Sequence, residues 1–491
     1  METLLSHLLT TANHYPDRTA LQFGDHALRY GELGARILAT AARLRAMGVK
    51  VGDRILICGG NTPAIPILYF AVHALGAVAV PLAPETPDHV LTALARDAAV
   101  RLAIVQKAVD GMACEVISPA NATAWVPGDR EIERVCCPDA VADLLYTTGT
   151  TGRKKGVVLT QANILAAARN INAFIGNGPD DREVMPLPLS HSFGLGRLRC
   201  LALAGHTLLL EPGVGAGAPL VKRLLDIKAT GLALVPAGFE ILRRMTGDAI
   251  GEAREHLRYV EIGSAPMKPD TRQWLMRMLP RTRICHHYGL TEATRAAFTE
   301  YHSDAHKPGT AGRATPNVEI TIRDDAGRTL PAGKMGEVVV RGEMVMREYW
   351  REPTLTRETL CSRGLRTGDL GYLDADGYLF LLGRRNDLIN VGGRKVIPDE
   401  VEDVLCQLDG VQDAGCIGQP DELMGECIKA YLVSDREIGR AELVAFLRLR
   451  LEEWKIPQTI ERVASIPRTS SGKIQRQMLR QLQEAAWTSV P

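Results

Sequence analysis

The chain has 491 residues, of which 46% are hydrophobic and 23% charged, and its 58 basic side chains nearly balance its 57 acidic ones. At roughly 150 residues per domain, this length predicts about three units, or one large domain with an appendage. The near-zero net charge does not indicate binding to nucleic acid. The ten cysteines show no CxxC or Cys/His ligand spacing, which argues against a zinc site or a disulfide framework and favours a cytoplasmic setting.

The first apolar segments of the chain predict buried elements and no membrane span. The N-terminal stretch METLLSHLLTTANHYP lacks a basic region ahead of its apolar residues, so it predicts an amphipathic helix and not a secretion signal. Residues 63–84 form an apolar run long enough to cross a bilayer. Pro66, His73 and Gly76 divide this run, which predicts a buried helix followed by a short buried strand.

From Ala20 to about Ile117, β-rich runs such as RILICGG alternate with amphipathic helical stretches such as YGELGARILATAARLRAMG. The alternation continues through HTLLLEP, GLALVPA and RYVEIGSAP, and it predicts a layered, mostly parallel α/β sheet. After about Lys307, alternating strands joined by Asp-Gly turns predict an antiparallel β subdomain.

The C-terminal part of the chain returns to a mixed pattern. PDEVEDVLCQL and RAELVAFLRLRLEEW predict helices, and IKAYLVS predicts a strand, so this part reads as a small α+β domain. The polar stretch GRRND lies between two apolar strands and is the predicted junction. We therefore predict an α/β core over 1–383, a hinge over 384–387 and a C-terminal lid domain over 388–491.

One loop stands out for its chemistry, LLYTTGTTGRKKGVVLT at 144–160. A loop rich in Gly and Thr after a β-run offers backbone N–H groups and hydroxyls, and its basic residues suit a polyphosphate. The Walker A pattern GxxxxGK[ST] is not met, because Lys154 stands at the place of its second glycine. Taken alone, the stretch is equally well read as a flexible surface turn.

Four further stretches occur in order: PLPLSHSFG at 186–194, HHYGLTEAT at 286–294, RTGDLGYLDADGYLFLLGRRNDLINVGGRKVIPDEVE at 366–402 and PRTSSGKIQRQML at 467–479. With the loop at 144–160, they resemble the signature motifs of the adenylate-forming superfamily of acyl-CoA synthetases, luciferases and peptide-synthetase adenylation domains. The chain is most similar to an acyl- or aryl-CoA ligase. One departure is Lys154, where the family usually has Pro.

The resemblance implies a set of nucleotide-binding residues. Thr291 would contact the α-phosphate, and Glu292 would bind Mg²⁺ through a hard carboxylate oxygen. Asp369 would accept both ribose hydroxyls, since one carboxylate offers two acceptor oxygens. The ATP- and AMP-binding residues that the resemblance implies are Thr147, Thr148, Gly149, Thr150, Thr151, Gly152, Lys155, Tyr288, Asp369 and Arg384.

The resemblance also implies mobile parts. Lys473, in a small-residue loop, would bridge the attacking carboxylate and the α-phosphate, and His191 would gate the acid and thiol channels. The catalytic residues are thus expected to be Lys473, His191, Thr291 and Glu292. Gly392 and Gly393 would let a pantetheine arm approach, and Asn386 or Asp387 would be the hinge.

The acid itself is less well specified by the sequence. The acyl pocket is expected to involve Phe239, Gly194, Gly263, Ser264, Ala265 and His287. Amino-acid-activating relatives place Asp where this chain has Gly194, so an α-amino acid is not expected. Arg197, Arg199 and Arg295 could meet a second polar group on the acid, but the more ordinary interpretation is that they face solvent.

The expected function is therefore ATP-dependent activation of a small carboxylic acid to acyl-AMP, followed by thioester formation with coenzyme A. ATP, Mg²⁺ and coenzyme A are the expected cofactors. An alternative within the class is a stand-alone enzyme that loads the phosphopantetheine of an acyl carrier protein. A catalytically inactive homologue that acts as a binding module is disfavoured, because Lys155, Glu292, Asp369 and Lys473 are all present.

Overall fold

The computed structural model describes residues 2–107, 109–124, 137–148, 154–213, 217–468 and 473–488. It divides into two compact units. The first comprises Met1–Ile320 with Val340–Leu365, and the second comprises Thr321–Val339 with Arg366–Pro491. The expected hinge at 384–387 lies within the second unit, and the domain limits proposed from the sequence stay predictions.

A seven-stranded sheet of the first unit has the order β18-β8-β7-β4-β3-β5-β6. Its central strands β7, β4, β3 and β5 pair in parallel, whereas β8 is antiparallel to β7. The buried helix and strand expected in the apolar run 63–84 are confirmed as α3 and β4. The elements of this layer are β3 Arg54–Cys58, α3 Ala64–Ala74, β4 Val78–Leu82, α4 Asp88–Asp97, β5 Val100–Val105, β6 Glu115–Ile117, α5 Pro119–Ala122, β7 Val141–Thr148, β8 Lys154–Thr160, β18 Glu348–Tyr349 and α11 Pro353–Thr359.

A nine-stranded sheet of the same unit has the order β15-β14-β13-β12-β11-β9-β10-β1-β2 and is parallel from β13 to β1. Helices α8, α9 and α10 pack against it around an apolar cluster that includes Val260, Ile262 and Ile284. Its elements are β1 Thr19–Phe23, β2 His26–Arg29, β9 Arg182–Met185, β10 Thr207–Leu210, α8 Gly217–Asp226, β11 Gly231–Leu234, α9 Pro236–Thr246, the 3-10 helix Ala249–Ala253, β12 Tyr259–Ile262, α10 Pro269–Met278, β13 Arg283–Tyr288, β14 Ala297–Glu300 and β15 Arg313–Ala314.

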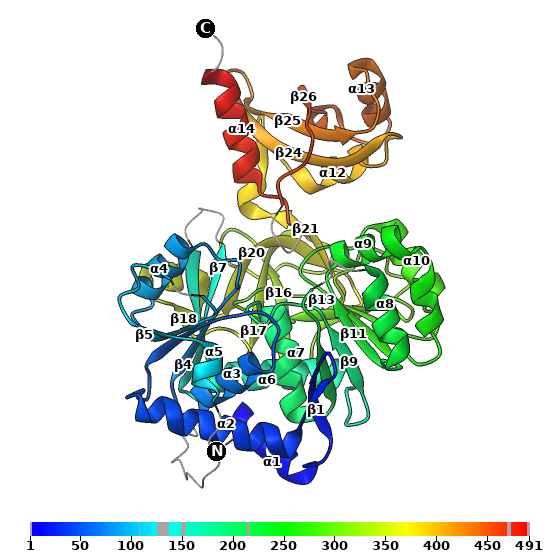
Figure 1. Ribbon diagram of the computed structural model, residues 1–491. Helices are drawn as coiled ribbons and strands as arrows, with labels where there is room; N and C mark the ends of the chain where they lie inside the picture. The colour runs from blue at the N-terminus through cyan, green and yellow to red at the C-terminus, as the bar shows by residue number, and fades with distance from the viewer. Residues whose placement is uncertain are drawn as a thin grey trace. The chain divides into compact units, whose positions relative to one another are not determined.

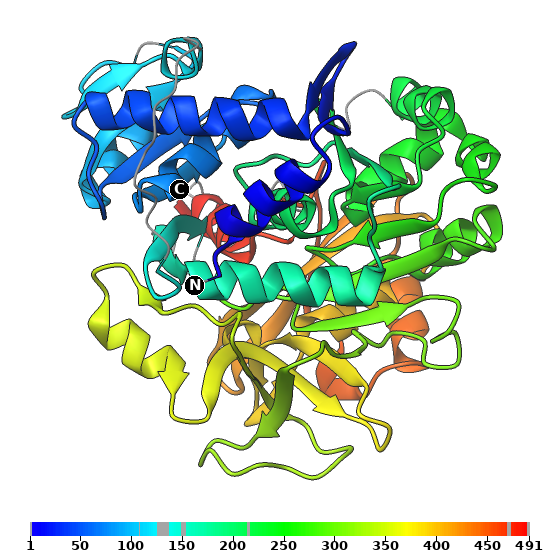
Figure 2. The same cartoon turned by 90° about the horizontal axis from the view of Figure 1, so that it is seen from below.

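Four helices of the first unit pack together: α1 Leu4–His14, α2 Tyr30–Ala46, α6 Gln161–Ile175 and α7 Ser192–Ala204. Figures 1 and 2 show this group from two sides. Thr3 and Thr160 cap α1 and α6 through reciprocal side-chain hydrogen bonds, which satisfy N–H groups that a helix start leaves open. The N-terminal amphipathic helix is thus confirmed. Within the described residues, no helix combines the length and the apolar character that crossing a bilayer would require.

The second unit contains antiparallel pairs, as the sequence predicted. Strand β20 pairs antiparallel with β21, and a further sheet has the order β23-β22-β25-β24, with β26 beside β25. Helix α13 ends at Arg448, earlier than predicted, and the next residue in the apolar pattern, Leu449, is exposed. The elements from Val318 onward are β16 Val318–Arg323, β17 Gly336–Gly342, β19 Leu360–Cys361, β20 Gly364–Leu373, β21 Leu379–Arg384, the 3-10 helix Arg385–Asp387, β22 Ile389–Val391, β23 Arg394–Val396, α12 Pro398–Leu405, β24 Val411–Asp421, β25 Gly425–Ser434, α13 Arg440–Arg448, the 3-10 helix Glu453–Lys455, β26 Thr459–Arg462 and α14 Arg476–Thr488.

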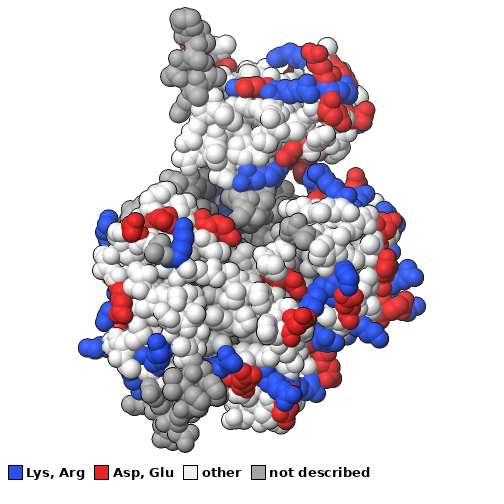
Figure 3. Space-filling view, in the orientation of Figure 1, with Lys and Arg blue, Asp and Glu red and all other residues white. Residues whose placement is uncertain are grey.

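Charged side chains of both signs lie beside one another in Figure 3, mostly towards the margins of the face drawn. This distribution agrees with the near balance of 58 basic and 57 acidic residues in the sequence.

Candidate functional site

The expected phosphate-binding stretch begins at the end of β7 and resumes on β8. The antiparallel register places Thr147 opposite Lys155 and Thr148 opposite Lys154. Gly149, Thr150, Thr151 and Gly152 lie outside the described residues. Lys155 is half-buried, with its Nζ 5.7 Å from the centroid of the Tyr349 ring. Among the described residues it makes no ion pair with a carboxylate, so its charge is available to an anionic ligand.

The nucleotide motif follows strand β13. Tyr288 is the last residue of that strand and pairs with Ala297 on β14. Thr291 and Glu292 lie in the half-buried loop beyond it. The hydroxyl of Tyr349 donates a hydrogen bond of 2.7 Å to Oε1 of Glu292. Tyr349 therefore touches two residues that the sequence assigned to polyphosphate and Mg²⁺, Glu292 and Lys155.

A buried cluster of charged residues lies beside the expected acyl pocket. Arg295, on the loop after β13, has its Nε 3.1 Å from Oε1 of Glu261 on β12. Nδ1 of His287 is 2.9 Å from the same oxygen. Burial alone would raise the pKa of Glu261, but Arg295 and Arg197 lower it well below its usual value. Burial lowers the pKa of His287 to about 4, with Arg295 adding to the effect, so its imidazole is neutral at pH 7.

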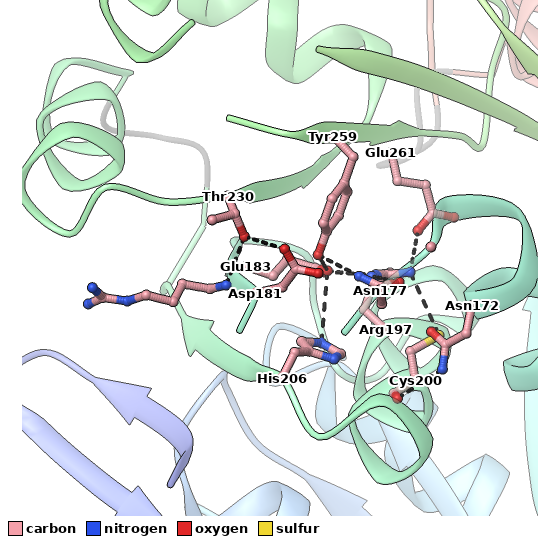
Figure 4. Close-up of polar contacts among 12 residues, drawn as sticks. Asn172, Asn177, Asp181, Glu183, Arg197, Cys200, His206, Thr230, Tyr259 and Glu261 are labelled. Carbon is pink, nitrogen blue, oxygen red and sulfur yellow. Dashed lines mark hydrogen bonds and ion pairs between the residues drawn. The ribbon is translucent and has the colours of Figure 1, made fainter. Parts of the chain in front are cut away.

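The cluster continues through Arg197 on α7, as Figure 4 shows. Its Nε donates to Glu183 at 2.7 Å, and a terminal nitrogen lies 3.1 Å from Glu261. Tyr259 donates a hydrogen bond of 2.6 Å to Glu183. Burial lowers the pKa of the nearby His206 to about 4.

The interpretation of the three arginines as solvent-facing is wrong. Arg197, Arg199 and Arg295 are at most 1% exposed. Arg199 pairs with Asp143 and donates a hydrogen bond to the hydroxyl of Tyr69 at 2.9 Å. Each guanidinium has a buried carboxylate as its partner, and this pairing offsets the cost of removing the charge from water.

The histidine motif is positioned at the start of α7. His191 caps this helix, and its Nδ1 accepts a hydrogen bond of 3.3 Å from the backbone N–H of Phe193. The side chain of Asn61 donates to the carbonyls of Leu187 and Glu211 and fixes the preceding loop. This anchoring was not expected from the sequence.

Close packing surrounds the glycines of the expected acyl pocket. A Cβ on Gly194 would lie 2.3 Å from the carbonyl oxygen of Pro188, so no side chain fits there without a backbone shift. A Cβ on Gly263 would lie 2.0 Å from the imidazole of His287, so this ring lies directly against the glycine.

The remaining expected pocket residues have different surroundings. Ser264 has a positive φ of 78°, and the Ala265 carbonyl accepts from His286 at 3.0 Å. Phe239 lies on α9 and is completely buried in the apolar cluster that also includes Val260, Ile262 and Ile284. Its part in acid binding stays a prediction.

In the second unit, the expected ribose-binding pair lies on facing strands. Asp369 on β20 stands opposite Arg384 on β21, with Nε and Oδ1 2.8 Å apart. Arg384 also donates to the Thr367 carbonyl at 3.0 Å. The Asp369 side chain is 11% exposed and that of Arg384 is 36% exposed, so a partly exposed ion pair supports one edge of the Asp369 carboxylate.

Lys473 is exposed and lies shortly before α14. Three residues later, Arg476 binds Asp399 and Glu402 and lies 3.5 Å from Asp387, in the expected hinge. Burial raises the pKa of Glu402 to about 7 even though Arg476 opposes this shift. The sequence did not indicate that Arg476 contacts the expected hinge.

The two expected thiol-channel glycines form the turn between β22 and β23. Gly392 and Gly393 have φ values of 58° and 80°, a conformation that glycine adopts without strain. The other expected hinge residue, Asn386, lies in the 3-10 helix Arg385–Asp387.

Two family models match successive parts of the chain. Residues 8–350 match the family model described as AMP-binding enzyme, and residues 400–473 match its C-terminal domain model. The chain is 30% identical to the long-chain-fatty-acid–CoA ligase FadD13 of Mycobacterium tuberculosis over 93% of both chains. It is 33% identical to a feruloyl-CoA synthase of Amycolatopsis sp over 94% of both chains. Among solved structures, it matches the o-succinylbenzoate CoA synthetase MenE of Bacillus subtilis, in complex with its acyl-adenylate intermediate, with a TM-score of 0.89, 28% identity and 98% coverage of both chains.

Proposed function

This chain belongs to the AMP-binding enzyme family and is an AMP-forming acid–thiol ligase, and we propose that its substrate is a monocarboxylic acid with an uncharged aryl or acyl tail. The enzyme uses ATP, Mg²⁺ and coenzyme A. In the first half-reaction, a carboxylate oxygen bonds to the α-phosphorus as the bond to pyrophosphate breaks. In the second, the thiolate of coenzyme A bonds to the acyl carbon and AMP leaves.

We assign the phosphate and metal roles to the first unit. Lys155 has no carboxylate partner among the described residues, and its charge would neutralise the β- and γ-phosphates. Glu292 accepts from Tyr349 through Oε1, while its other oxygen has no hydrogen bond or ion pair in the described part of the chain. A half-buried carboxylate oxygen without a protein donor suits a hard divalent cation, so Glu292 fits Mg²⁺.

We assign the sugar and the transition state to residues of the second unit. Asp369 would accept the ribose hydroxyls while Arg384 holds its carboxylate. Lys473 would stabilise the charge that develops between the acid and the α-phosphate. Its exposed position shortly before α14 supports a side chain that approaches the substrate only during the first half-reaction.

One observation supports the uncharged tail more than any other: the buried arginines near the expected acyl pocket are already paired. Arg197 and Arg295 share the cluster with Glu183 and Glu261, so two positive and two negative charges cancel. His287 adds no charge at pH 7, because burial lowers its pKa to about 4. A second carboxylate on the acid would have to break a buried ion pair to gain a partner, which costs several kcal/mol.

The packing at Gly194 supports the exclusion of α-amino acids. An ammonium buried in the pocket needs a carboxylate partner, since an unpaired buried charge costs several kcal/mol. The position where amino-acid-activating relatives carry that carboxylate is Gly194 here, and the Pro188 carbonyl leaves no room for a side chain.

Pyrophosphate exchange across a panel of acids tests the proposal. The panel contains long-chain fatty acids, ferulate, 2-succinylbenzoate and the standard amino acids, each at equal concentration. We expect exchange with a fatty acid or an aryl monoacid to exceed exchange with 2-succinylbenzoate by at least about tenfold, which corresponds to 1.4 kcal/mol. Strongest exchange with 2-succinylbenzoate or with an amino acid would contradict the proposal.

The acceptor and the compartment need separate measurements. Supplying a phosphopantetheinylated carrier protein in place of coenzyme A tests the alternative acceptor, and we expect free coenzyme A to be the better one.

We propose a cytoplasmic location, since the cysteines of the described chain are unpaired thiols. Fractionation of cells that express the enzyme would check this location.

A further inference from the structure

Tyr349 joins two groups that act on the same ligand. Its hydroxyl donates to Oε1 of Glu292 at 2.7 Å, and Nζ of Lys155 lies 5.7 Å from its ring centroid. Both contacts connect segments that are far apart in the sequence. A single side chain, 6% exposed, is thus in contact with the proposed Mg²⁺ ligand and the proposed phosphate-binding lysine.

The backbone around Tyr349 is fixed on two sides. Strand β18 pairs with β8, so that Tyr349 stands opposite Val157, two residues beyond Lys155. The N–H of Met346 donates to the carbonyl of Glu292 at 2.8 Å. The N–H of Tyr349 itself donates to Oγ1 of Thr356 in α11 at 3.0 Å. These bonds fix the backbone at Tyr349 relative to β8 and link its segment to the backbone of Glu292.

The contact with Glu292 leaves one carboxylate oxygen for a cation. The Tyr349 hydroxyl binds Oε1 and so restricts the rotation of the carboxylate, whereas Oε2 has no partner among the described residues. Hydrogen bonds to charged groups are stronger than those between neutral groups, so this bond holds the carboxylate in one orientation. Groups that orient a metal ligand commonly influence metal affinity by about tenfold or more.

We propose that Tyr349 is a positioning residue that couples Mg²⁺ binding to polyphosphate binding: its hydroxyl orients Glu292 for the cation, and its ring supports the ammonium of Lys155. This inference rests on the proposed role of Glu292. It goes beyond that role because it assigns the metal dependence of nucleotide binding to a residue outside the motifs at 144–160 and 286–294.

The test compares equilibrium binding of ATP with and without the metal. Calorimetry on the complete enzyme without acid or coenzyme A measures ATP binding in the presence of Mg²⁺ and in the presence of EDTA. For Tyr349→Phe, which keeps the ring and loses the hydroxyl, we expect MgATP binding to weaken about tenfold and metal-free ATP binding to change by less than about twofold. Tyr30→Phe is the matched control, because it removes a buried hydroxyl that donates to the carbonyls of Leu201 and His206.

A double-mutant cycle with Glu292→Gln separates this inference from the proposed function. If Tyr349 acts through Glu292, the effect of Tyr349→Phe on MgATP binding disappears in the Glu292→Gln background. If Glu292→Gln weakens MgATP binding but Tyr349→Phe does not, the inference is wrong and the role of Glu292 stands. If Glu292→Gln has no effect on MgATP binding, the metal role of Glu292 fails, and the inference fails with it. Equal weakening of MgATP and metal-free ATP by Tyr349→Phe would also overturn the inference.

Discussion

Arg295 and Glu261 form a buried ion pair, with Nε and Oε1 3.1 Å apart. Arg295 also donates to the carbonyls of Ser192 and Phe193 at the start of α7. It holds these contacts with a positive φ of 54°, which is uncommon for a residue other than glycine. One side chain thereby ties the loop of the nucleotide motif to β12 and to the helix that begins after His191.

Replacing Glu261 with Gln should therefore destabilise the first unit. The variant leaves the Arg295 guanidinium buried without its carboxylate, and removing one partner of a buried pair typically costs about 3–5 kcal/mol. Urea unfolding measures this loss. Glu255→Gln is the control, because the Glu255 side chain is 68% exposed and its pairs with Arg254 and Arg281 are on the surface. We expect the control to stay within about 0.5 kcal/mol of the parent. Similar losses for both variants would contradict a structural role for the buried pair.

The sequence predicted this fold well where local periodicity decides the structure. The helix and strand of residues 63–84 and the antiparallel pairs of the second unit follow from apolar spacing, Pro and Gly. The extent of α13 was overestimated, since the apolar repeat continues to Leu451 although the helix ends at Arg448. The apolar periodicity predicts that a segment is helical, but tertiary packing decides at which residue the helix ends.

The candidate site was predictable only where its residues are contiguous in the chain. The motif around Glu292 indicates a carboxylate for Mg²⁺, but it contains no sign of Tyr349, a partner 57 residues away. The prediction that the three arginines face solvent was wrong for a related reason, because arginine is usually exposed unless it is paired. Whether a carboxylate such as Glu261 lies beside Arg295 depends on how β12 and β13 pair, and this register is not written in either segment alone.

The half-buried His286 should make stability depend on pH. Its two nitrogens lie 3.0 Å from the Ala265 carbonyl and 2.8 Å from the Tyr301 hydroxyl, an arrangement that suits a neutral ring. Burial lowers its pKa to about 3, and the neighbouring His287 adds to the shift. Below pH 6.5 the unfolded state binds a proton that the folded state does not, so this contribution to stability is complete above pH 6.5 and falls progressively between pH 6.5 and 3.

The variant His286→Gln removes this titration while keeping a donor and an acceptor. Between pH 7.5 and 5.0, we expect the parent to lose about 2 kcal/mol more stability than the variant, as measured by urea unfolding at both pH values. His26→Gln, which changes an exposed histidine, should leave the pH dependence of the parent unchanged. An identical pH dependence in the parent and in His286→Gln would show that His286 does not titrate differently in the two states.

Replacing Lys473 with Ala should separate the two half-reactions. Without the ammonium, charge that develops between the acid and the α-phosphate loses its partner, so acyl-AMP formation should slow by about a hundredfold or more. The thioester step from supplied acyl-AMP should be nearly unchanged, because we expect this lysine to have left the substrate by then. Single-turnover measurements of each step check this division. Arg480→Ala, which removes an exposed charge from α14, should affect neither step. Equal losses in both steps would show that Lys473 has no step-specific role.

The proposed hinge at Asn386 and Asp387 leads to the opposite partition. Asn386→Pro fixes φ at residue 386 and disfavours the helical region for Arg385, whose guanidinium pairs with Asp325 and Glu337. If rotation about this segment brings the thiol-binding turn at Gly392 and Gly393 to the acyl-AMP, the thioester step should slow more than acyl-AMP formation. Asn386→Ala removes the same side chain and leaves φ free, so it should affect both steps little. Single-turnover rates from isolated acyl-AMP measure the difference. A proline variant that forms thioester at the parent rate would place the hinge elsewhere, because restricted φ at a true pivot must slow the step that requires rotation.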